Sequence, residues 1–194
     1  LAMSEQAQPL MDAVQKHISE NVAPITEEFF SLDKEKEDRW SWHPRQLELL
    51  EGAKDKAKAS GLWNFFLPGY SEIGEGLTNL DYAYIATELG KWALASESLN
   101  CSAPDTGNME VLERVGTPEQ QEKWLKPLLN GEIRSAYAMT EPGLPSSDAK
   151  NISTSAVLDG DDWLINGEKF YISGAGDPRC KIMITMVKTD PDAP

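Results

Sequence analysis

Apolar residues recur every three or four positions near the amino terminus, and this pattern predicts helices. The longest stripe consists of Leu10, Val14, Ile18, Val22, Ile25 and Phe29. Because this spacing places side chains on one face of an α-helix, we expect a helix over residues 9–30, kinked at Pro24. Pro44 suits the first turn of a second helix, which should continue until Gly61 caps it.

Helical signals continue to about residue 130. Glycines and a proline between residues 68 and 76 indicate a loop, after which Thr78 or Asn79 can begin a helix. Shorter helices are expected over residues 93–102 and 109–114. A last helix has Thr117 as its N-cap, Pro118 as its first residue, Gln120 as its capping-box partner and Asn130–Gly131 as its terminator.

After Arg134 the period of the apolar positions changes to about two, which predicts strands. The runs "SAYAMT" at 135–140 and "CKIMITMVKT" at 180–189 each favour one strand. Between these two runs we expect further strands, separated by turns at Asp159–Asp162 and at Asn166–Gly167. The Asn-Gly pair is typical of a hairpin turn.

These patterns predict an α+β chain. An N-terminal all-α helical domain would cover residues 1–132, and an incomplete antiparallel β domain would cover residues 133–194. So few strands leave an exposed edge, whose unpaired backbone groups another piece of chain would have to cover. The chain begins at Leu1 and ends just after a strand-like run, so we expect it to be cut at both ends.

Composition limits the possible partners. Of 194 residues, 40% are hydrophobic, which is enough to form a buried core. The net charge of -14 disfavours nucleic acid, because neutralising phosphates requires clustered Lys and Arg. The longest apolar stretch, residues 61–69, is too short to span a membrane. Cys101 and Cys180 lie far apart in the sequence, and we expect both to be reduced, buried thiols.

Two stretches are candidates for ligand binding. The first, "AYAMTEPGLPSSDAKN" at 136–151, gathers hydroxyls and backbone amides after a predicted strand. Thr140 with Ser146 or Ser147 could bind a polar heterocycle or a phosphate. Alternatively, these hydroxyls could simply satisfy the amides of a turn.

The second stretch is "WLINGEKFYISGAG" at 163–176. It predicts a strand in which Phe170 and Ile172 face one side while Tyr171 and Ser173 face the other. A flat ring could stack on Tyr171 beside the Ser173 hydroxyl, although an ordinary half-buried strand would show the same alternation.

The sequence does not predict a catalytic triad, a metal site or a glycine-rich nucleotide-binding loop. His17 and His43 both lie in the helical part, so they support neither a His-based triad nor a metal cluster, and we expect both to be structural or at the surface. The glycines lack the spacing of a phosphate loop or a dinucleotide fingerprint. Apolar positions that we expect to lie in the core are Trp63, Trp124 and Trp163.

The two candidate stretches resemble motifs of the acyl-CoA dehydrogenase family. "YAMTEPGLPSSD" is similar to that family's strand-and-loop pattern of an aromatic residue, Thr-Glu-Pro-Gly and Ser-Asp, and "INGEKFYISGAG" is similar to its Asn-Gly-x-Lys strand. The helices between Asn100 and Pro142 also resemble the family's middle helices in order and separation, so the resemblance covers about residues 9–190. The doubled serine and "SGAGDPRCK" resemble the branch that contains acyl-CoA dehydrogenase family members ten and eleven.

The resemblance implies that the cofactor is FAD, whose flavin in this family lies against the two β segments. The positions implied to bind it are Tyr137, Met139, Thr140, Ser146, Ser147, Tyr171 and Ser173. Tyr171 would replace the family's usual tryptophan, and Ser173 would replace the threonine whose hydroxyl reaches the flavin. Ser146 or Ser147 would lie near both the cofactor and the substrate's pantetheine arm, and an extra residue in the loop leaves that choice open.

The resemblance also implies a reaction. A carboxylate removes the α-proton of an acyl-CoA thioester while the β-hydrogen leaves as a hydride to the flavin. In the family this carboxylate comes from a C-terminal helical domain that is absent from this chain. We therefore expect no catalytic base and no metal site within residues 1–194, and no activity from the chain alone. Glu141 belongs to the cofactor loop and is not expected to be the base.

Two other functions remain possible on the sequence. The chain could belong to a non-catalytic interaction module of the same fold, or to an acyl-CoA oxidase or flavin monooxygenase. For a dehydrogenase of fatty acid metabolism, the resemblance implies an acyl-CoA substrate, an acceptor such as an electron-transfer flavoprotein, and a homodimer or homotetramer. The compartment would be the cytoplasm of a bacterium, or the mitochondrion or peroxisome of a eukaryote.

Overall fold

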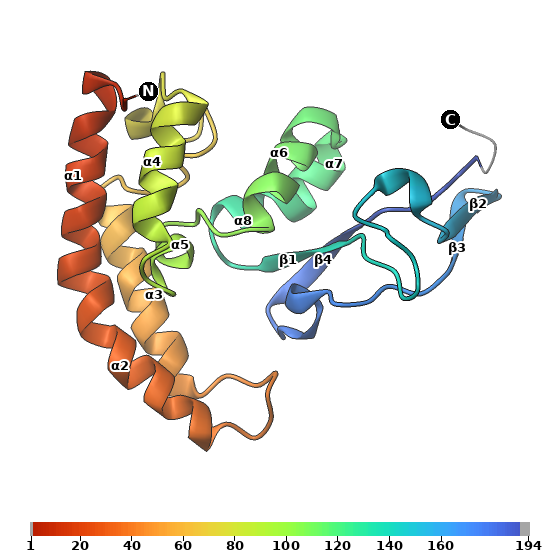
Figure 1. Ribbon diagram of the computed structural model, residues 1–194, viewed down its shortest axis with the longest axis horizontal. Helices are drawn as coiled ribbons and strands as arrows, with labels where there is room; N and C mark the ends of the chain where they lie inside the picture. Colours follow the sequence, from red (N-terminus) through yellow and green to blue (C-terminus); the bar gives the residue numbers. More distant parts are fainter. Residues whose placement is uncertain (1, 191–194) are drawn as a thin grey trace. The chain divides into compact units, whose positions relative to one another are not determined.

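The computed structural model describes residues 2–190, with Ile73 described by its backbone alone, and it divides into two compact units. The first unit is Leu1–Glu110 and the second is Val111–Pro194. This division falls before the boundary expected at residue 132, because the helices after Val111 group with the β segment. Figure 1 labels the elements of both units.

The first unit is helical, as the apolar stripes predict. Its helices are α1 (Gln8–His17), α2 (Ala23–Ser31), α3 (Pro44–Ala59), α4 (Asn79–Leu89), α5 (Ala95–Ser98) and the first part of α6 (Asp105–Val115). All the apolar residues of the first stripe are buried except Ile25, which is partly buried. They pack with Leu50, Phe65, Ile85, Leu89 and Leu99 in one core. Burial of this continuous apolar stripe is what holds the helices together.

A widened turn joins α1 to α2. Ile18–Val22 form a π-helical turn in which Ala23 N–H donates to Ile18 O. In a regular α-helix the ring of Pro24 would clash with the carbonyl four residues earlier, and the wider turn relieves that clash. Figure 1 shows α1 and α2 as one continuous, curved run. The kink expected at Pro24 is therefore confirmed, and its form is a π-bulge.

Capping contacts settle where the next helices begin. Thr78 caps α4, because its Oγ1 accepts from Asp81 N–H at 3.2 Å while Asp81 Oδ2 accepts from Thr78 N–H at 3.1 Å. Pro44 is the first residue of α3, and His43 caps it by accepting from Arg45 N–H at 3.1 Å. The helices expected over 93–102 and 109–114 differ in extent: α5 has only 4 residues, and α6 begins earlier, at Asp105.

The second unit opens with a short helical run. It consists of α7 (Pro118–Gln120), a π-helical turn at Gln121–Leu125 and α8 (Lys126–Leu129). Thr117 and Gln120 form the predicted capping box, and Gly131, with φ of 71°, ends the run. Pro127 accounts for this π turn by the same steric argument as Pro24.

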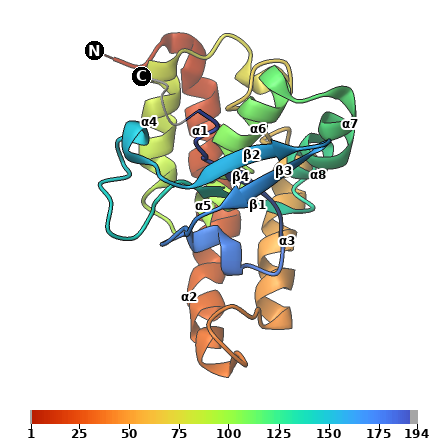
Figure 2. The same ribbon diagram turned by 90° about the vertical axis from the view of Figure 1, so that its right-hand side faces the viewer.

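The strands are β1 (Arg134–Ala138), β2 (Ser155–Asp159), β3 (Asp162–Asn166) and β4 (Cys180–Thr185). β2 and β3 form the expected antiparallel hairpin, whereas β1 and β4 run parallel, so the β region is mixed. Figure 2 shows β1 and β4 lying side by side. A parallel pair needs a long crossover, which sequence period alone does not reveal, and residues 139–179 supply it here.

Residues 170–173 do not form the predicted strand. Tyr171 has φ of 55°, which interrupts an extended chain, and Ser173–Gly176 is a 3-10 turn. Asn166–Gly167 ends β3 and makes no hairpin, because the hairpin turns earlier, within the predicted Asp159–Asp162 turn. The expectation of a hairpin at Asn166–Gly167 was therefore wrong.

Candidate cofactor site

The residues after β1 bring the two sequence motifs together. Ala138 O accepts from Met186 N–H at 2.9 Å, and Thr140 O accepts from Phe170 N–H at 2.9 Å. Lys169 Nζ donates to Met139 O at 3.0 Å. The first residues of the first motif are thus held by the residue after β4 and by the second motif, although Glu141 and Lys169 lie 28 positions apart in the sequence.

Glu141 anchors this junction with a buried carboxylate. Its Oε2 accepts from Ser153 N–H and Oγ–H, both at 2.7 Å, and its Oε1 accepts from Thr154 N–H at 2.9 Å and Lys169 Nζ at 2.8 Å. Burial opposes ionisation, but hydrogen bonds from Lys169, Thr154 and Ser153 outweigh it and hold the pKa of Glu141 well below its usual range. A carboxylate held this way is a poor proton acceptor at neutral pH.

Ser146 and Ser147, which the sequence could not distinguish as binding residues, differ in burial and hydrogen bonding. Ser146 is buried at 2% exposure, and its Oγ accepts from Glu141 N–H at 2.8 Å. Ser147 is exposed, and Asp148 turns the next residues by accepting from Lys150 N–H at 3.1 Å. Only Ser147 therefore has a hydroxyl on the surface of the loop.

The second motif exposes Tyr171 and Ser173, although not from the expected strand. Tyr171 is 81% exposed, and its ring centroid lies 3.9 Å from that of Phe170. Ser173 begins the 3-10 turn, which runs close to β1. A Cβ on Gly174 would lie 3.0 Å from Ser135 O, so glycine permits this close approach.

The residues predicted to bind the cofactor differ in their exposure to solvent. Tyr137, Thr140, Ser147, Tyr171 and Ser173 are exposed, Met139 is half-buried and Ser146 is buried. Within residues 2–190 the hydroxyls of Thr140, Ser147 and Ser173 make no hydrogen bond. An aromatic face with uncommitted hydroxyls suits a flat ring that has polar edges, so the exposed residues fit a flavin.

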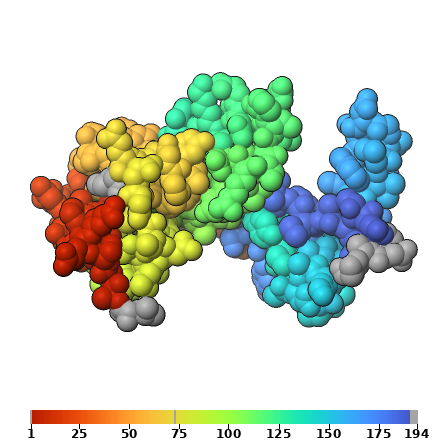
Figure 3. Space-filling model, turned by 90° about the horizontal axis from the view of Figure 1, so that it is seen from above, coloured from red at the N-terminus to blue at the C-terminus, as the bar shows by residue number. Residues whose placement is uncertain are grey.

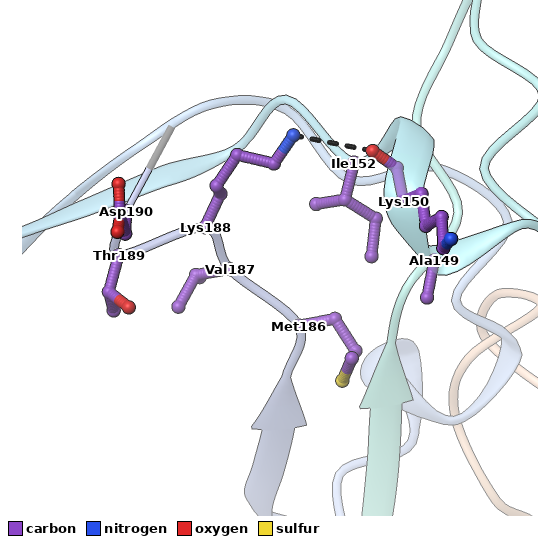
Figure 4. A pocket seen from close by; sticks show the side chains of 8 residues that line it. All are labelled: Ala149, Lys150, Ile152, Met186, Val187, Lys188, Thr189 and Asp190. Atoms are coloured by element: carbon purple, nitrogen blue, oxygen red, sulfur yellow. Dashed lines mark hydrogen bonds between the residues drawn. The ribbon is translucent and has the colours of Figure 1, made fainter. Parts of the chain in front are cut away.

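A separate hollow lies between the end of the loop and the residues after β4 (Figure 4). Its volume is about 340 Å³, and it is lined by Ala149, Lys150, Ile152, Met186, Val187, Lys188, Thr189 and Asp190. Lys188 Nζ donates to Lys150 O at 3.3 Å, which joins the two sides. None of the predicted cofactor residues lines this hollow.

The remaining candidates from the sequence have structural roles. His17 is buried with its Nε2 3.1 Å from Ser98 Oγ, and burial, with nearby Lys56, lowers the pKa of this histidine. His43 caps α3. No three His, Cys, Asp or Glu side chains gather as a metal site in the part of the chain that the structure describes. Between residues 2 and 190, no helix combines the length and apolar character needed to cross a membrane.

The cysteines and tryptophans match expectation only in part. Within residues 2–190 neither cysteine forms a disulfide, and burial raises the pKa of the Cys101 thiol to about 12, whereas Cys180 is only half-buried. Trp63 and Trp124 are half-buried. Trp163 is 54% exposed, so its expected place in the core was wrong. Among residues 2–190, β2 and β3 pair only with each other, apart from one bridge at Ser155.

Sequence reasoning missed three residues of the site: Ser153, Thr154 and Lys169. Lys169 stands in the quoted Asn-Gly-x-Lys motif, so its position carried a signal. Nothing in the linear order pairs it with Glu141, because the two meet only through the crossover that leads to β4.

Comparison with known proteins identifies the family. The model of the acyl-CoA dehydrogenase N-terminal domain matches residues 4–132, and that of the middle domain matches residues 136–194. The chain belongs to the acyl-CoA dehydrogenase family. Acyl-CoA dehydrogenase family member 10 of Mus musculus is 48% identical over 195 residues, covering 95% of this chain and 18% of that protein. This confirms the resemblance to the branch with members ten and eleven.

Solved structures of acyl-CoA dehydrogenases show the same fold. A structure described as a "putative acyl-CoA dehydrogenase" from Mycobacterium abscessus is 44% identical with a TM-score of 0.87, covering 100% of this chain and 48% of that chain. A glutaryl-CoA dehydrogenase from Mycobacterium smegmatis, in complex with FADH2, is 23% identical with a TM-score of 0.68, covering 97% of this chain and 44% of that chain. The chain thus spans about half the length of these solved structures. Their similarity confirms the predicted helical domain followed by a β region.

Proposed function

We propose that this chain supplies part of the FAD site of an acyl-CoA dehydrogenase, which forms a double bond between the α and β carbons of an acyl-CoA thioester. When bound, FAD would accept the hydride that leaves the β carbon. The observation that supports this proposal most is the junction of the two family motifs. There, backbone and side-chain bonds hold the Thr140 segment beside the Phe170 segment.

The residues of this chain would bind and orient the ring. Thr140 and Ser173 would offer hydroxyls to its polar edges, and Tyr171 would offer an aromatic face. Ser147 would contact the cofactor or the substrate's pantetheine arm, because the Ser146 hydroxyl already accepts from Glu141 N–H. Holding the ring and the thioester in one orientation accounts for a large share of the rate in such reactions.

The catalytic base would come from outside residues 1–194. Glu141 is the buried carboxylate at the junction, and four hydrogen bonds together with a depressed pKa keep it ionised and engaged. A base needs a free acceptor within reach of the substrate proton, and Glu141 has none to offer. The 194-residue chain alone is therefore proposed to be inactive.

The proposed partners follow from the family. They are an acyl-CoA substrate, an electron acceptor such as an electron-transfer flavoprotein, and further copies of the protein in a homodimer or homotetramer. The relatives carry the family name over chains about twice as long or longer, so these partners belong to the whole protein.

Reconstitution of the full-length gene product with FAD tests the proposal. We expect a visible flavin band that bleaches when an acyl-CoA is added without oxygen. Thr140→Val should weaken FAD binding, because it removes a hydroxyl while keeping the side-chain shape. Thr87→Val is the matched control, since Thr87 is an exposed residue of α4 whose Oγ1 bonds only its own helix, to Ala83 O at 2.8 Å. A protein that stays colourless with excess FAD would refute the proposal.

A further inference from the structure

We propose that the Lys169–Glu141 ion pair positions the flavin ring without touching it, by fixing the two cofactor-binding segments against each other. This inference rests on the proposed function, because it assumes that FAD binds at the junction. The pair therefore acts on the cofactor through Thr140 on one segment and through Tyr171 and Ser173 on the other.

Lys169 binds the residues on both sides of Thr140, Met139 through its backbone and Glu141 through its side chain. Its Nζ donates to Met139 O at 3.0 Å and to Glu141 Oε1 at 2.8 Å, so one ammonium group fixes the residues before and after Thr140. Phe170 N–H then donates to Thr140 O at 2.9 Å. These three bonds set the register of Thr140 against the segment that carries Tyr171 and Ser173.

Glu141 extends the same anchor to the rest of the loop. Its carboxylate accepts from Ser153 and Thr154, and its own N–H donates to Ser146 Oγ at 2.8 Å. Residues 153–154 and Lys169 thus meet at the side chain of Glu141, and Ser146 meets its backbone. The side chains of Lys169 and Glu141 are 13% and 2% exposed, so water competes little for these bonds.

The exposed residues have no comparable support of their own. Within residues 2–190 the hydroxyls of Thr140, Ser147 and Ser173 make no hydrogen bond, so their positions depend on the backbone beneath them. Tyr171 is 81% exposed and follows directly from Lys169 and Phe170. Loss of the ion pair would therefore move the groups that meet the ring, even though neither charged group belongs to the exposed surface.

The test compares Lys169→Met and Glu141→Gln with wild type in the full-length gene product. We expect each variant to bind FAD about tenfold or more weakly, measured by flavin fluorescence with apo-protein. We also expect a changed visible absorbance band and a shifted flavin reduction potential at saturating FAD, because the hydroxyls at the ring edges have moved. In the double variant, Glu141→Gln should cost less affinity than it does alone, since the two changes break one interaction.

Lys54→Met is the matched control, because it breaks another buried ion pair in the helical unit. The Lys54 side chain is 3% exposed and lies 2.7 Å from Glu51 and 3.3 Å from Glu97. This control should lower the melting temperature while leaving the FAD affinity, absorbance band and potential unchanged. Lys169→Met and Glu141→Gln proteins that lose only melting temperature, with wild-type flavin properties, would overturn the inference.

The outcomes separate this inference from the proposed function. Wild-type protein that binds no FAD refutes the proposed function and this inference with it. Wild-type binding with unchanged affinity and spectrum in the variants refutes only the positioning role. If Lys169→Met does not fold, Glu141→Gln decides alone, since its amide oxygen can still accept a hydrogen bond and it changes the charge with little change of shape.

Discussion

At the scale of single residues, buried polar side chains do most of the local organising. Asp81 is 2% exposed and accepts from Ser4 N–H at 2.7 Å, from Thr78 Oγ1–H at 2.7 Å and from Thr78 N–H at 3.1 Å. It therefore completes the cap of α4 and fastens the amino-terminal segment to that helix. The hydrogen bond from Ser4, followed by those from Thr78, lowers the pKa of Asp81 to about 2.

The lowered pKa of Asp81 predicts that its contribution to stability depends on pH. A carboxyl whose pKa is lower in the folded state stabilises the fold above its ordinary pKa of 3.8, and that stability is lost as the pH falls toward 2. We expect Asp81→Asn to melt below wild type at pH 7, with the gap narrowing between pH 5 and pH 2. Thermal unfolding followed by circular dichroism would measure it. Asp55→Asn, at an exposed position of α3, is the control, and a gap for Asp81→Asn that stays constant with pH would contradict the prediction.

At the scale of elements, polar side-chain contacts join helices whose apolar stripes do not by themselves fix how they pack against each other. Lys54 of α3 is buried beside Glu97 of α5 at 3.3 Å, and it also pairs with Glu51 at 2.7 Å. Gln46 of α3 donates to Phe29 O of α2 at 2.9 Å. These contacts fix α3 against its neighbours at defined points, whereas apolar packing alone would tolerate some sliding.

Removal of the Lys54 cation should therefore be costly. We expect Lys54→Ala to lower the free energy of unfolding by about 2 kcal/mol, because the carboxylate of Glu97, whose side chain is only 15% exposed, loses this cation. Lys54→Met should cost less, since it keeps the packing of the aliphatic stem. Chemical denaturation of both variants would test this. Equal losses, or none for Lys54→Ala, would show that the pair contributes little.

At the scale of the whole molecule, the second unit has an apolar face that is exposed to solvent. Leu158, Trp163 and Ile165 lie on one face of the β2–β3 hairpin and are 57%, 54% and 52% exposed. In Figure 3 this hairpin, in light blue, stands out from the rest of its unit. Exposed apolar faces of this kind promote association in water.

The 194-residue chain by itself should therefore self-associate as its concentration rises. We expect the double substitution Trp163→Lys with Ile165→Lys to lower its average mass in solution, because charges on the hairpin oppose association. Light scattering across a concentration series would measure it. Trp40→Lys, which changes a 44% exposed aromatic residue of the helical unit, is the control, and an equal effect from that control would contradict the prediction.

The sequence by itself determined the features that depend on neighbours along the chain. Helix stripes, the caps at Thr78 and Thr117, the kink at Pro24 and the turn at Asp159–Asp162 were all predictable, because each arises within a few residues. The family motifs likewise marked the two segments that meet where Phe170 bonds Thr140. These features reflect local backbone geometry and side-chain spacing, which the order of residues encodes directly.

Only the tertiary structure decided which distant groups meet. The parallel pairing of β1 with β4 departs from the antiparallel arrangement that we expected. The positive φ of Tyr171 interrupts the strand predicted there, and Trp163 is exposed although we expected it in the core. The contact of Glu141 with Lys169 depends on the same long crossover. Hydrogen bonding between segments and burial by partners far along the chain set these outcomes, and spacing within one segment does not record them.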